Sequence, residues 1–139
     1  MSQPHWNWSH AQTLASDTSL TSEVIEALLA QLRADAWEER DIFGVHLAVE
    51  EALVNAIKHG NREQADKRVA LAFRVNGQCV QVEITDEGPG FDPAAIPDPT
   101  TSDHVDQPNG RGIMLMRSFM SRVEFSERGN RVLLEKVRT

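Results

Sequence analysis

Three polar residues spaced four positions apart could do chemistry on one face of a predicted helix. They are Glu51, Asn55 and His59, and side chains at this spacing form one row along an α-helix. A carboxylate in such a row can accept a proton from a hydroxyl or a water, and carboxylate and amide oxygens are suitable ligands for Mg²⁺. The spacing alone, however, favours a plainer interpretation, the solvated polar face of an amphipathic helix.

A second candidate is a glycine-rich segment that directly follows a predicted strand. It reads Asp86-Glu87-Gly88-Pro89-Gly90-Phe91. Glycines allow the backbone to pass close to a ligand or to adopt a positive φ, and an Asp at a strand end can accept a hydrogen bond from an exocyclic amine. Taken alone, the segment is more simply an ordinary Asp-Gly-Pro-Gly turn.

A third candidate is Gly110-Arg111-Gly112, which comes just before an apolar run. The N-terminus of a helix presents free amide groups and the positive end of the helix dipole, which together bind phosphate. Arg111 could add a positive charge there. Two glycines around one residue are weak evidence alone, and a flexible hinge before the helix is the alternative.

Hydrophobic periodicity indicates the helices that would carry these residues. Apolar residues at four-residue spacing from Leu20 predict a first helix, with residues 18–19 as candidate N-caps. A second helix is predicted over about 38–59, and Gly60 stands at the C′ position that commonly ends a helix. The apolar run 113–120 predicts a third, buried helix.

Strict alternation of apolar and polar residues predicts the strands. One hairpin is expected around Asn76-Gly77, the favoured pair for a two-residue turn. A second hairpin is expected from the strands 123–126 and 131–137. The stretch 86–109 between the hairpins is rich in proline and glycine, and a loop of this length in a compact domain is usually functional or mobile.

Antiparallel strands with segregated helices predict the fold class α+β. The expected architecture is a two-layer α/β sandwich with a mixed, mostly antiparallel sheet and helices on one face. The N-terminal segment with Trp6 and Trp8 is expected to pack as a first strand, and an added edge strand or a dimer contact is the alternative.

Length and composition limit the class of protein. The chain has 139 residues, 40% of them apolar, which suits a single domain over residues 1–139 with its own core. A net charge of −7 argues against a nucleic-acid partner, but leaves room for a small phosphorylated ligand. We expect no membrane association, because no apolar run approaches about 20 residues. We also expect no signal peptide, because residues 1–10 have no basic segment that leads into an apolar stretch. The single Cys79 excludes a disulfide framework, so a cytoplasmic location is expected.

The three candidate motifs occur in an order that resembles a known family. With Glu51 and Asn55, Asp86 and its glycines, and Gly110 to Gly112, the chain resembles the GHKL (Bergerat-fold) ATPases. Within them it is most similar to the anti-sigma-factor serine/threonine kinases of the RsbW and SpoIIAB group. The resemblance covers about residues 20–136, and it implies that the cofactors are ATP and Mg²⁺.

The resemblance also implies a role for each motif residue. Glu51 would be the catalytic general base, Asn55 would be the magnesium ligand and His59 would lie near the phosphates. Asp86 would accept from the adenine amino group, and residues 92–109 would form the ATP lid. The remaining cofactor-binding residues would be Gly88 and Gly90 beside the nucleotide, Gly110, Arg111 and Gly112 at the triphosphate, and Asn130 where the family usually has a Thr near adenine.

The function implied by the resemblance is an ATP-dependent serine/threonine protein kinase that acts as an anti-sigma factor. It would bind a sigma factor and phosphorylate a Ser or Thr of an anti-sigma-factor antagonist protein. Two alternatives remain at this point. One is a non-catalytic ATP-binding regulatory switch, and the other is a kinase in another bacterial signalling pathway. Family members often form dimers, so a homodimer is a further expectation.

Overall fold

The computed structural model of the chain describes residues 5–89 and 108–139. Of the predicted lid, residues 92–107 lie outside the described ranges, while residues 108 and 109 begin a helix. In the part of the chain that the structure describes, no helix combines the length and the apolar character that crossing a membrane requires.

The chain begins with one strand and two helices, continues with a hairpin and a third helix, and ends with a second hairpin. In order, they are β1 (Trp8–Ala15), a 3₁₀ turn (Thr18–Leu20), α1 (Thr21–Ala34), α2 (Glu39–Val54), a π-helical turn (Asn55–Gly60), β2 (Arg68–Val75), β3 (Cys79–Asp86), α3 (Pro108–Phe119), β4 (Arg122–Phe125) and β5 (Arg131–Val137). Both predicted hairpins are confirmed, as are the three predicted helices.

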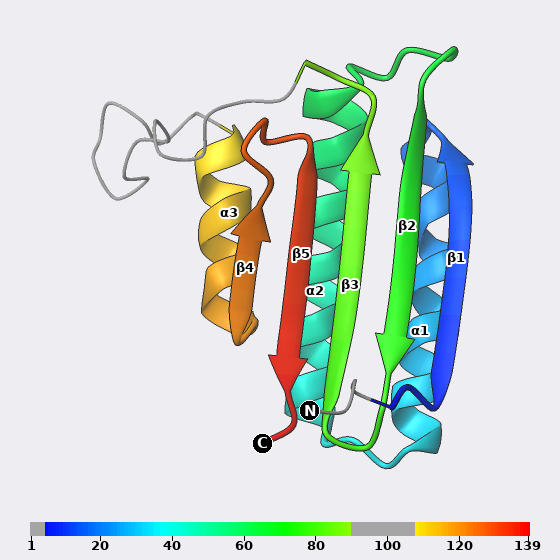
Figure 1. Ribbon diagram of the computed structural model, residues 1–139, viewed down its shortest axis with the longest axis vertical. Coiled ribbons are helices and arrows are strands. Elements are labelled where there is room, and N and C mark those ends of the chain that lie inside the picture. Colours follow the sequence, from blue (N-terminus) through cyan, green and yellow to red (C-terminus); the bar gives the residue numbers. More distant parts are fainter. Residues whose placement is uncertain (1–4, 90–107) are drawn as a thin grey trace.

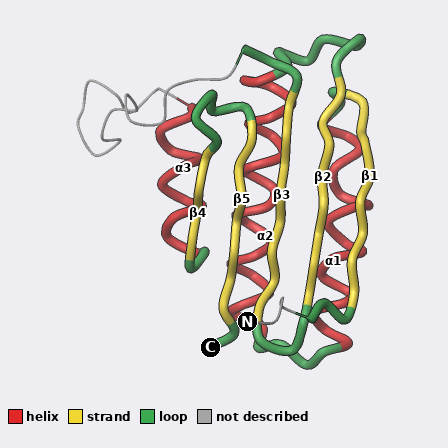
Figure 2. Tube along the Cα trace, viewed as in Figure 1, coloured by secondary structure: helices red, strands yellow, loops and turns green. Residues whose placement is uncertain are grey.

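The strands form one sheet in the order β1-β2-β3-β5-β4, and each described pairing between neighbours is antiparallel. The helices α1, α2 and α3 all lie on the same face of this sheet (Figures 1 and 2). The predicted α+β two-layer sandwich is therefore confirmed. Helix α2 runs behind the centre of the sheet, with α3 beside it (Figure 1). The C-terminal end of β3 and the start of β5 lie at the same end of the molecule as the C-terminal end of α2.

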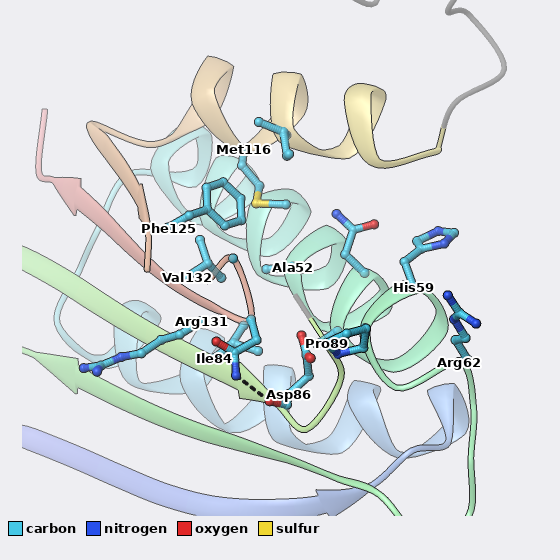
Figure 3. Close-up of a pocket in the computed structure, with 16 residues that line it drawn as sticks. Ala52, His59, Arg62, Ile84, Asp86, Pro89, Met116, Phe125, Arg131 and Val132 are labelled. Atoms are coloured by element: carbon cyan, nitrogen blue, oxygen red, sulfur yellow. Dashed lines mark hydrogen bonds between the residues drawn. The ribbon is translucent and has the colours of Figure 1, made fainter. Parts of the chain in front are cut away.

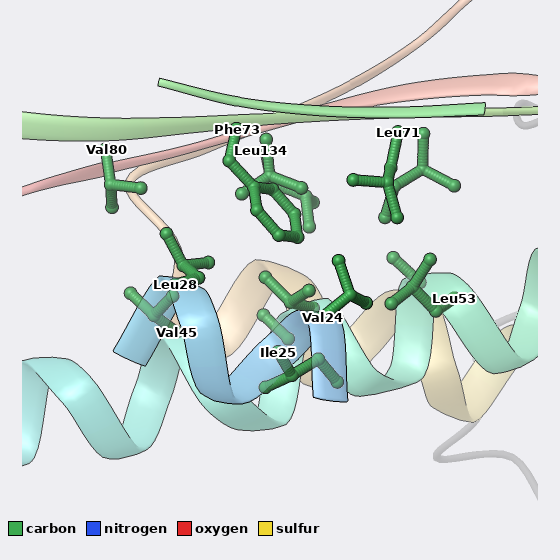
Figure 4. Packing of buried hydrophobic residues seen from close by; sticks show 14 of the residues in the cluster. Val24, Ile25, Leu28, Val45, Leu53, Leu71, Phe73, Val80 and Leu134 are labelled. Carbon is green, nitrogen blue, oxygen red and sulfur yellow. The ribbon is translucent and has the colours of Figure 1, made fainter. Parts of the chain in front are cut away.

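The core lies between the two layers. Alternate residues of β2 and β3, such as Leu71, Phe73 and Val80, point toward the helices and are buried, as the period-two pattern predicts. They pack against α1 residues such as Leu28 (Figure 4). Burying a large apolar side chain contributes roughly 1.5–3 kcal/mol, so this interface holds the helices in place on the sheet.

The start of the first helix differs from the prediction. Asp17, rather than residue 18 or 19, is the capping residue, and its carboxylate accepts the Ser19 N–H at 2.9 Å. The cap begins a 3₁₀ turn, and α1 follows only at Thr21. Leu20 lies in that turn and is 40% exposed, so the buried stripe starts with the residues of α1 itself.

The predicted two-residue turn at Asn76-Gly77 is wrong. Three residues separate β2 from β3, and neither Asn76 nor Gly77 has the positive φ that such a turn requires. Instead, the Asn76 carboxamide oxygen accepts the N–H groups of Gln78 and Cys79, both at 2.8 Å. This Asx-type turn uses the asparagine side chain and makes no use of the glycine's freedom.

The N-terminal segment forms β1 from Trp8 onward, which confirms a packed first strand there, whereas Trp6 lies before the strand. This strand is also an edge of the sheet, because only β2 pairs with it among the described strands. Trp8 is half-buried and packs against the core.

Candidate functional site

A cavity of about 230 Å³ lies between α2 with its π-helical turn, α3, and the ends of β3 and β5 (Figure 3). Its walls are largely apolar, with Ala52, Ala56, Ile84, Ile113, Met116, Phe125 and Val132 among the lining residues. The polar lining residues include Asn55, His59, Asp86 and Asn130. Apolar walls with a few placed polar groups are typical of a site for a small molecule.

Asp86 is the last residue of β3 and the buried carboxylate of this cavity. It is 9% exposed, and its Oδ1 accepts the Gly88 N–H at 2.8 Å. No residue in the described ranges donates a hydrogen bond to Oδ2. Burial raises the pKa of Asp86, while the Gly88 N–H and the nearby positive charges of Lys67 and Arg128 oppose that increase. Among the described residues, the cavity thus holds a carboxylate whose Oδ2 has no donor and can accept from a ligand.

Gly60 and Gly88 are required because two backbones and the Asp86 carboxylate meet in a small space. A Cβ on Gly60 would lie 2.4 Å from the Asp86 carboxyl carbon, and a Cβ on Gly88 would lie 1.9 Å from the Gly60 carbonyl oxygen. Gly60 does not have the left-handed conformation of a C′ residue, so that prediction is wrong. The glycine is needed because the Asp86 carboxylate approaches the backbone of residue 60 closely.

We expect Gly88→Ala to destabilise the fold and Gly77→Ala to leave it unchanged. The new methyl at 88 would overlap backbone, which cannot rotate away, and overpacking of this kind typically costs about 1–3 kcal/mol. A Cβ at Gly77 meets no atom within 4 Å. Urea unfolding of both variants measures the difference, and equal free energies of unfolding would contradict the packing described here.

Asn61 is a positioning residue that sequence reasoning missed. It is fully buried, and its amide nitrogen donates to Ser16 Oγ and to the Arg68 carbonyl, both at 2.9 Å. Its carboxamide oxygen accepts the Glu87 N–H at 2.8 Å. One side chain therefore ties the segment after Asp86 to the end of β1 and the start of β2. No local signal marks it, because an Asn after a helix is ordinary in a loop.

The predicted row of Glu51, Asn55 and His59 is divided between two kinds of helix. Glu51 lies in the last turn of α2, whereas Asn55 and His59 belong to the π-helical turn. A π-helical turn is wider than an α-helical turn, so four-residue spacing no longer keeps side chains strictly in line. Asn55 and His59 line the cavity. Glu51 does not line it, and its carboxylate is directed toward α3.

Helix α3 lies directly against Glu51 and Asn55 through Gly112. A Cβ on Gly112 would lie 2.6 Å from Asn55 Nδ2 and 3.1 Å from Glu51 Oε2. The structure therefore brings together residues from the first and third candidate motifs. Since α3 begins at Pro108, residues Gly110 and Arg111 lie inside its first turn and do not precede it. Gly90 lies outside the described residues.

Asn130 lines the cavity where the turn after β4 enters β5. Its amide nitrogen donates to the backbone carbonyl of Asp86 at 3.2 Å, and its carboxamide oxygen accepts from Ser126 Oγ at 3.3 Å. The Asp86 N–H in turn donates to the Asn130 carbonyl at 2.9 Å. Asn130 thus holds the strand ends together beside the cavity.

The described part of the chain holds no ready-made cage of ligands for a divalent cation. In residues 5–89 and 108–139, no group of three or more His, Cys, Asp or Glu residues could hold a metal ion. Mg²⁺ needs no such cage, because it usually keeps several bound waters. Its other ligands are commonly one or two protein side chains and the phosphates of the substrate. The Asn55 amide has no hydrogen-bond partner in the described residues and is available for such a role.

Comparison with known proteins places these features in a family. Residues 14–136 match the family model described as a histidine kinase-like ATPase domain. The serine/threonine-protein kinase BtrW of Bordetella bronchiseptica is 31% identical over 96 residues, which are 68% of each chain. An anti-sigma F factor of Clostridium beijerinckii is 33% identical over 118 residues, covering 81% of this chain and 80% of that protein.

A solved structure shares the fold. It contains the RsbU and RsbW domains of a Mycobacterium tuberculosis protein, and it matches 95% of this chain with a TM-score of 0.51 and 18% identity. The matched part is 32% of that longer chain. Together with the match over residues 14–136 and the cavity that joins the three motifs, these relationships show that the chain belongs to the histidine kinase-like (GHKL) ATPase family.

Proposed function

We propose that this chain is an ATP-dependent serine/threonine protein kinase that acts as an anti-sigma factor. Its partners would be a sigma factor and an anti-sigma-factor antagonist protein, and it would phosphorylate a Ser or Thr of the antagonist in the cytoplasm. Relatives named as a serine/threonine-protein kinase and as anti-sigma F factors support the proposal. The observation that carries its nucleotide site is Asp86 Oδ2, which accepts no hydrogen bond from the described residues and lies at the edge of an apolar cavity.

The adenine ring would lie between the apolar walls, with its amino group donating to Asp86 Oδ2. A guanine would present a carbonyl oxygen at the same place, and two acceptors facing each other are unfavourable. Since the Gly88 N–H holds Asp86 Oδ1, the site would select adenine by the position of Oδ2. Asn130 would act indirectly, by holding the end of β3.

The phosphates would extend toward Asn55, His59 and the first turn of α3. The first turn of α3, which contains Gly110 and Arg111, would face them at the positive end of the helix dipole. The predicted phosphate contact of the Gly112 N–H does not fit, because Gly112 lies past the first turn, where the N–H groups pair within the helix. Asn55 would be the protein ligand of Mg²⁺, which when bound offsets phosphate charge. Gly90 and the lid would complete the enclosure of the nucleotide and limit hydrolysis by water.

Glu51 would act as the general base. In the proposed step, the Ser or Thr hydroxyl of the antagonist gives its proton to the Glu51 carboxylate while its oxygen bonds to the γ-phosphorus. The bond from that phosphorus to the bridging oxygen breaks, and ADP leaves. Phosphoryl transfer requires positioning and charge stabilisation more than covalent help from the protein, which suits a site with few reactive side chains.

Calorimetric titration with ATP, with and without Mg²⁺, tests the nucleotide site, and transfer of labelled γ-phosphate to candidate antagonist proteins of the same genome tests the kinase. Magnesium-dependent binding together with transfer to one of them is expected. Binding without any transfer would favour the non-catalytic switch, whereas transfer to a protein unconnected with sigma factors would favour another signalling pathway. Absence of binding at millimolar ATP would contradict the proposal.

The raised pKa of Asp86 predicts opposite pH dependences for stability and for binding. Because the folded protein holds the proton more tightly than the unfolded chain, the contribution of Asp86 to stability is largest at acid pH. That contribution falls as the pH rises through the raised pKa. ATP affinity should change in the other direction, since the ionised carboxylate is the stronger acceptor. The free energy of unfolding and the ATP affinity are measured against pH for the wild type and for Asp86→Asn, and the difference between the two proteins removes the titration of ATP itself. If the wild type and the variant had the same pH dependence, for stability or for affinity, the prediction would be contradicted.

A further inference from the structure

Arg62 has a backbone conformation that is unusual for its residue type. Its φ is +53° and that of Glu63 is +57°, which is the left-handed region where a Cβ is unfavourable. The two residues reverse the chain after the π-helical turn, and the Glu63 N–H closes the reversal by donating to the Ile57 carbonyl at 2.8 Å. Glycine is the usual residue at such a helix end, so an arginine here has a conformational cost.

The Arg62 side chain lines the cavity from this reversal. In Figure 3 it lies with His59 at the end of the cavity away from Met116 and Phe125. Arg62 is exposed and makes no ion pair with any residue in the described ranges. A guanidinium without an acidic partner at a cavity mouth is free to bind an anion.

The other arginine among the lining residues has a different environment. Arg131 forms an ion pair with Glu83 at 2.5 Å, and Figure 3 shows its side chain directed away from His59 and Arg62. The chain as a whole carries a net charge of −7, which repels an approaching anion over the distance of a Debye length. A positive charge at the mouth of the cavity therefore changes the affinity for an anion more than it would in a basic protein.

We propose that Arg62 binds the phosphate groups of the nucleotide and makes the site select phosphorylated adenine nucleotides over adenosine. This inference rests on the proposed ATP-binding function and adds a residue outside the three motifs. The strained backbone is retained because it directs a cation to the end of the cavity where Asn55 and His59 already supply polar groups. The apolar walls and Asp86 bind the base, and Arg62 binds the anionic end.

Calorimetry with ADP and with adenosine tests the inference in the full chain. We expect Arg62→Gly to lower the affinity for ADP by about tenfold or more, while the affinity for adenosine changes less than about twofold. The salt dependence of ADP binding should become shallower. Thermal unfolding should show no loss of stability, because glycine adopts the left-handed conformation without strain.

Glu63→Gly is the matched control, because it relieves the same backbone strain but removes no cation. It should bind both ligands as the wild type does, and Arg62→Lys should recover part of the lost ADP affinity. Equal ADP affinity in Arg62→Gly and the wild type would overturn the inference alone. Equal losses for ADP and adenosine would overturn it too, since they indicate a structural effect. If the wild type bound neither ligand, the proposed function would fail, and the inference with it.

Discussion

Glu51→Gln is expected to reduce phosphoryl transfer by about 10²–10⁴-fold, the usual contribution of a general base. ATP affinity should remain within about twofold of the wild type, because Glu51 lies outside the residues that line the cavity. Its Oε2 is held beside Gly112 of α3, next to the Asn55 amide. A glutamine fills the same space but cannot accept the hydroxyl proton, so chemistry and binding should separate.

Glu50→Gln provides a matched control for this prediction. The substitution makes the same change from carboxylate to amide, one residue away from Glu51. Glu50 is exposed, and its carboxylate pairs with His46 at 3.4 Å. The Glu50→Gln variant should transfer phosphate at the wild-type rate. The measurement is single-turnover transfer from γ-labelled ATP to the antagonist, combined with calorimetric affinity for ATP. Undiminished transfer by Glu51→Gln would show that another group takes the proton.

Asp86→Asn is expected to weaken ATP binding by roughly 10–150-fold, which corresponds to a hydrogen bond to a charged group of about 1.5–3 kcal/mol. The Gly88 N–H bonds to Oδ1 in the wild type. An asparagine that keeps this bond must place its NH₂ group where Oδ2 was, and a donor would then face the amino group of adenine. The fold should persist, because burial already disfavours the charged form of Asp86.

Glu87→Gln is the control for Asp86→Asn. Glu87 is the neighbouring acid, but it is exposed and accepts the Arg68 N–H outside the cavity. The Glu87→Gln variant should bind ATP with wild-type affinity. Calorimetry gives the affinities, and urea unfolding shows whether each variant remains folded. A folded Asp86→Asn protein that bound ATP as tightly as the wild type would remove Asp86 from the site, and with it the main support for an adenine pocket.

The local pattern of the sequence was sufficient for most of the elements. The alternation in 69–75 and 80–84 predicted β2 and β3, because a half-buried strand must place every second residue in the core. The second hairpin was likewise expected from its two strands, and Gly129 in its turn has a φ of +82°. Local patterns failed where side-chain hydrogen bonds formed the turn. Between β2 and β3, the Asn76 side chain accepts two backbone N–H groups, and the expected two-residue turn with positive φ does not form.

The sequence by itself determined the α+β class, the order of the motifs and the residue types that the proposed chemistry needs, because these depend on periodicity and side-chain chemistry. Only the tertiary structure decided which of them meet. Gly112 contacts Asn55, and Gly60 contacts Asp86, although each pair is far apart in the chain. Asn61, Arg62 and the π-helical turn carry no local signal, since their roles come from close packing between segments that adjacent residues do not specify.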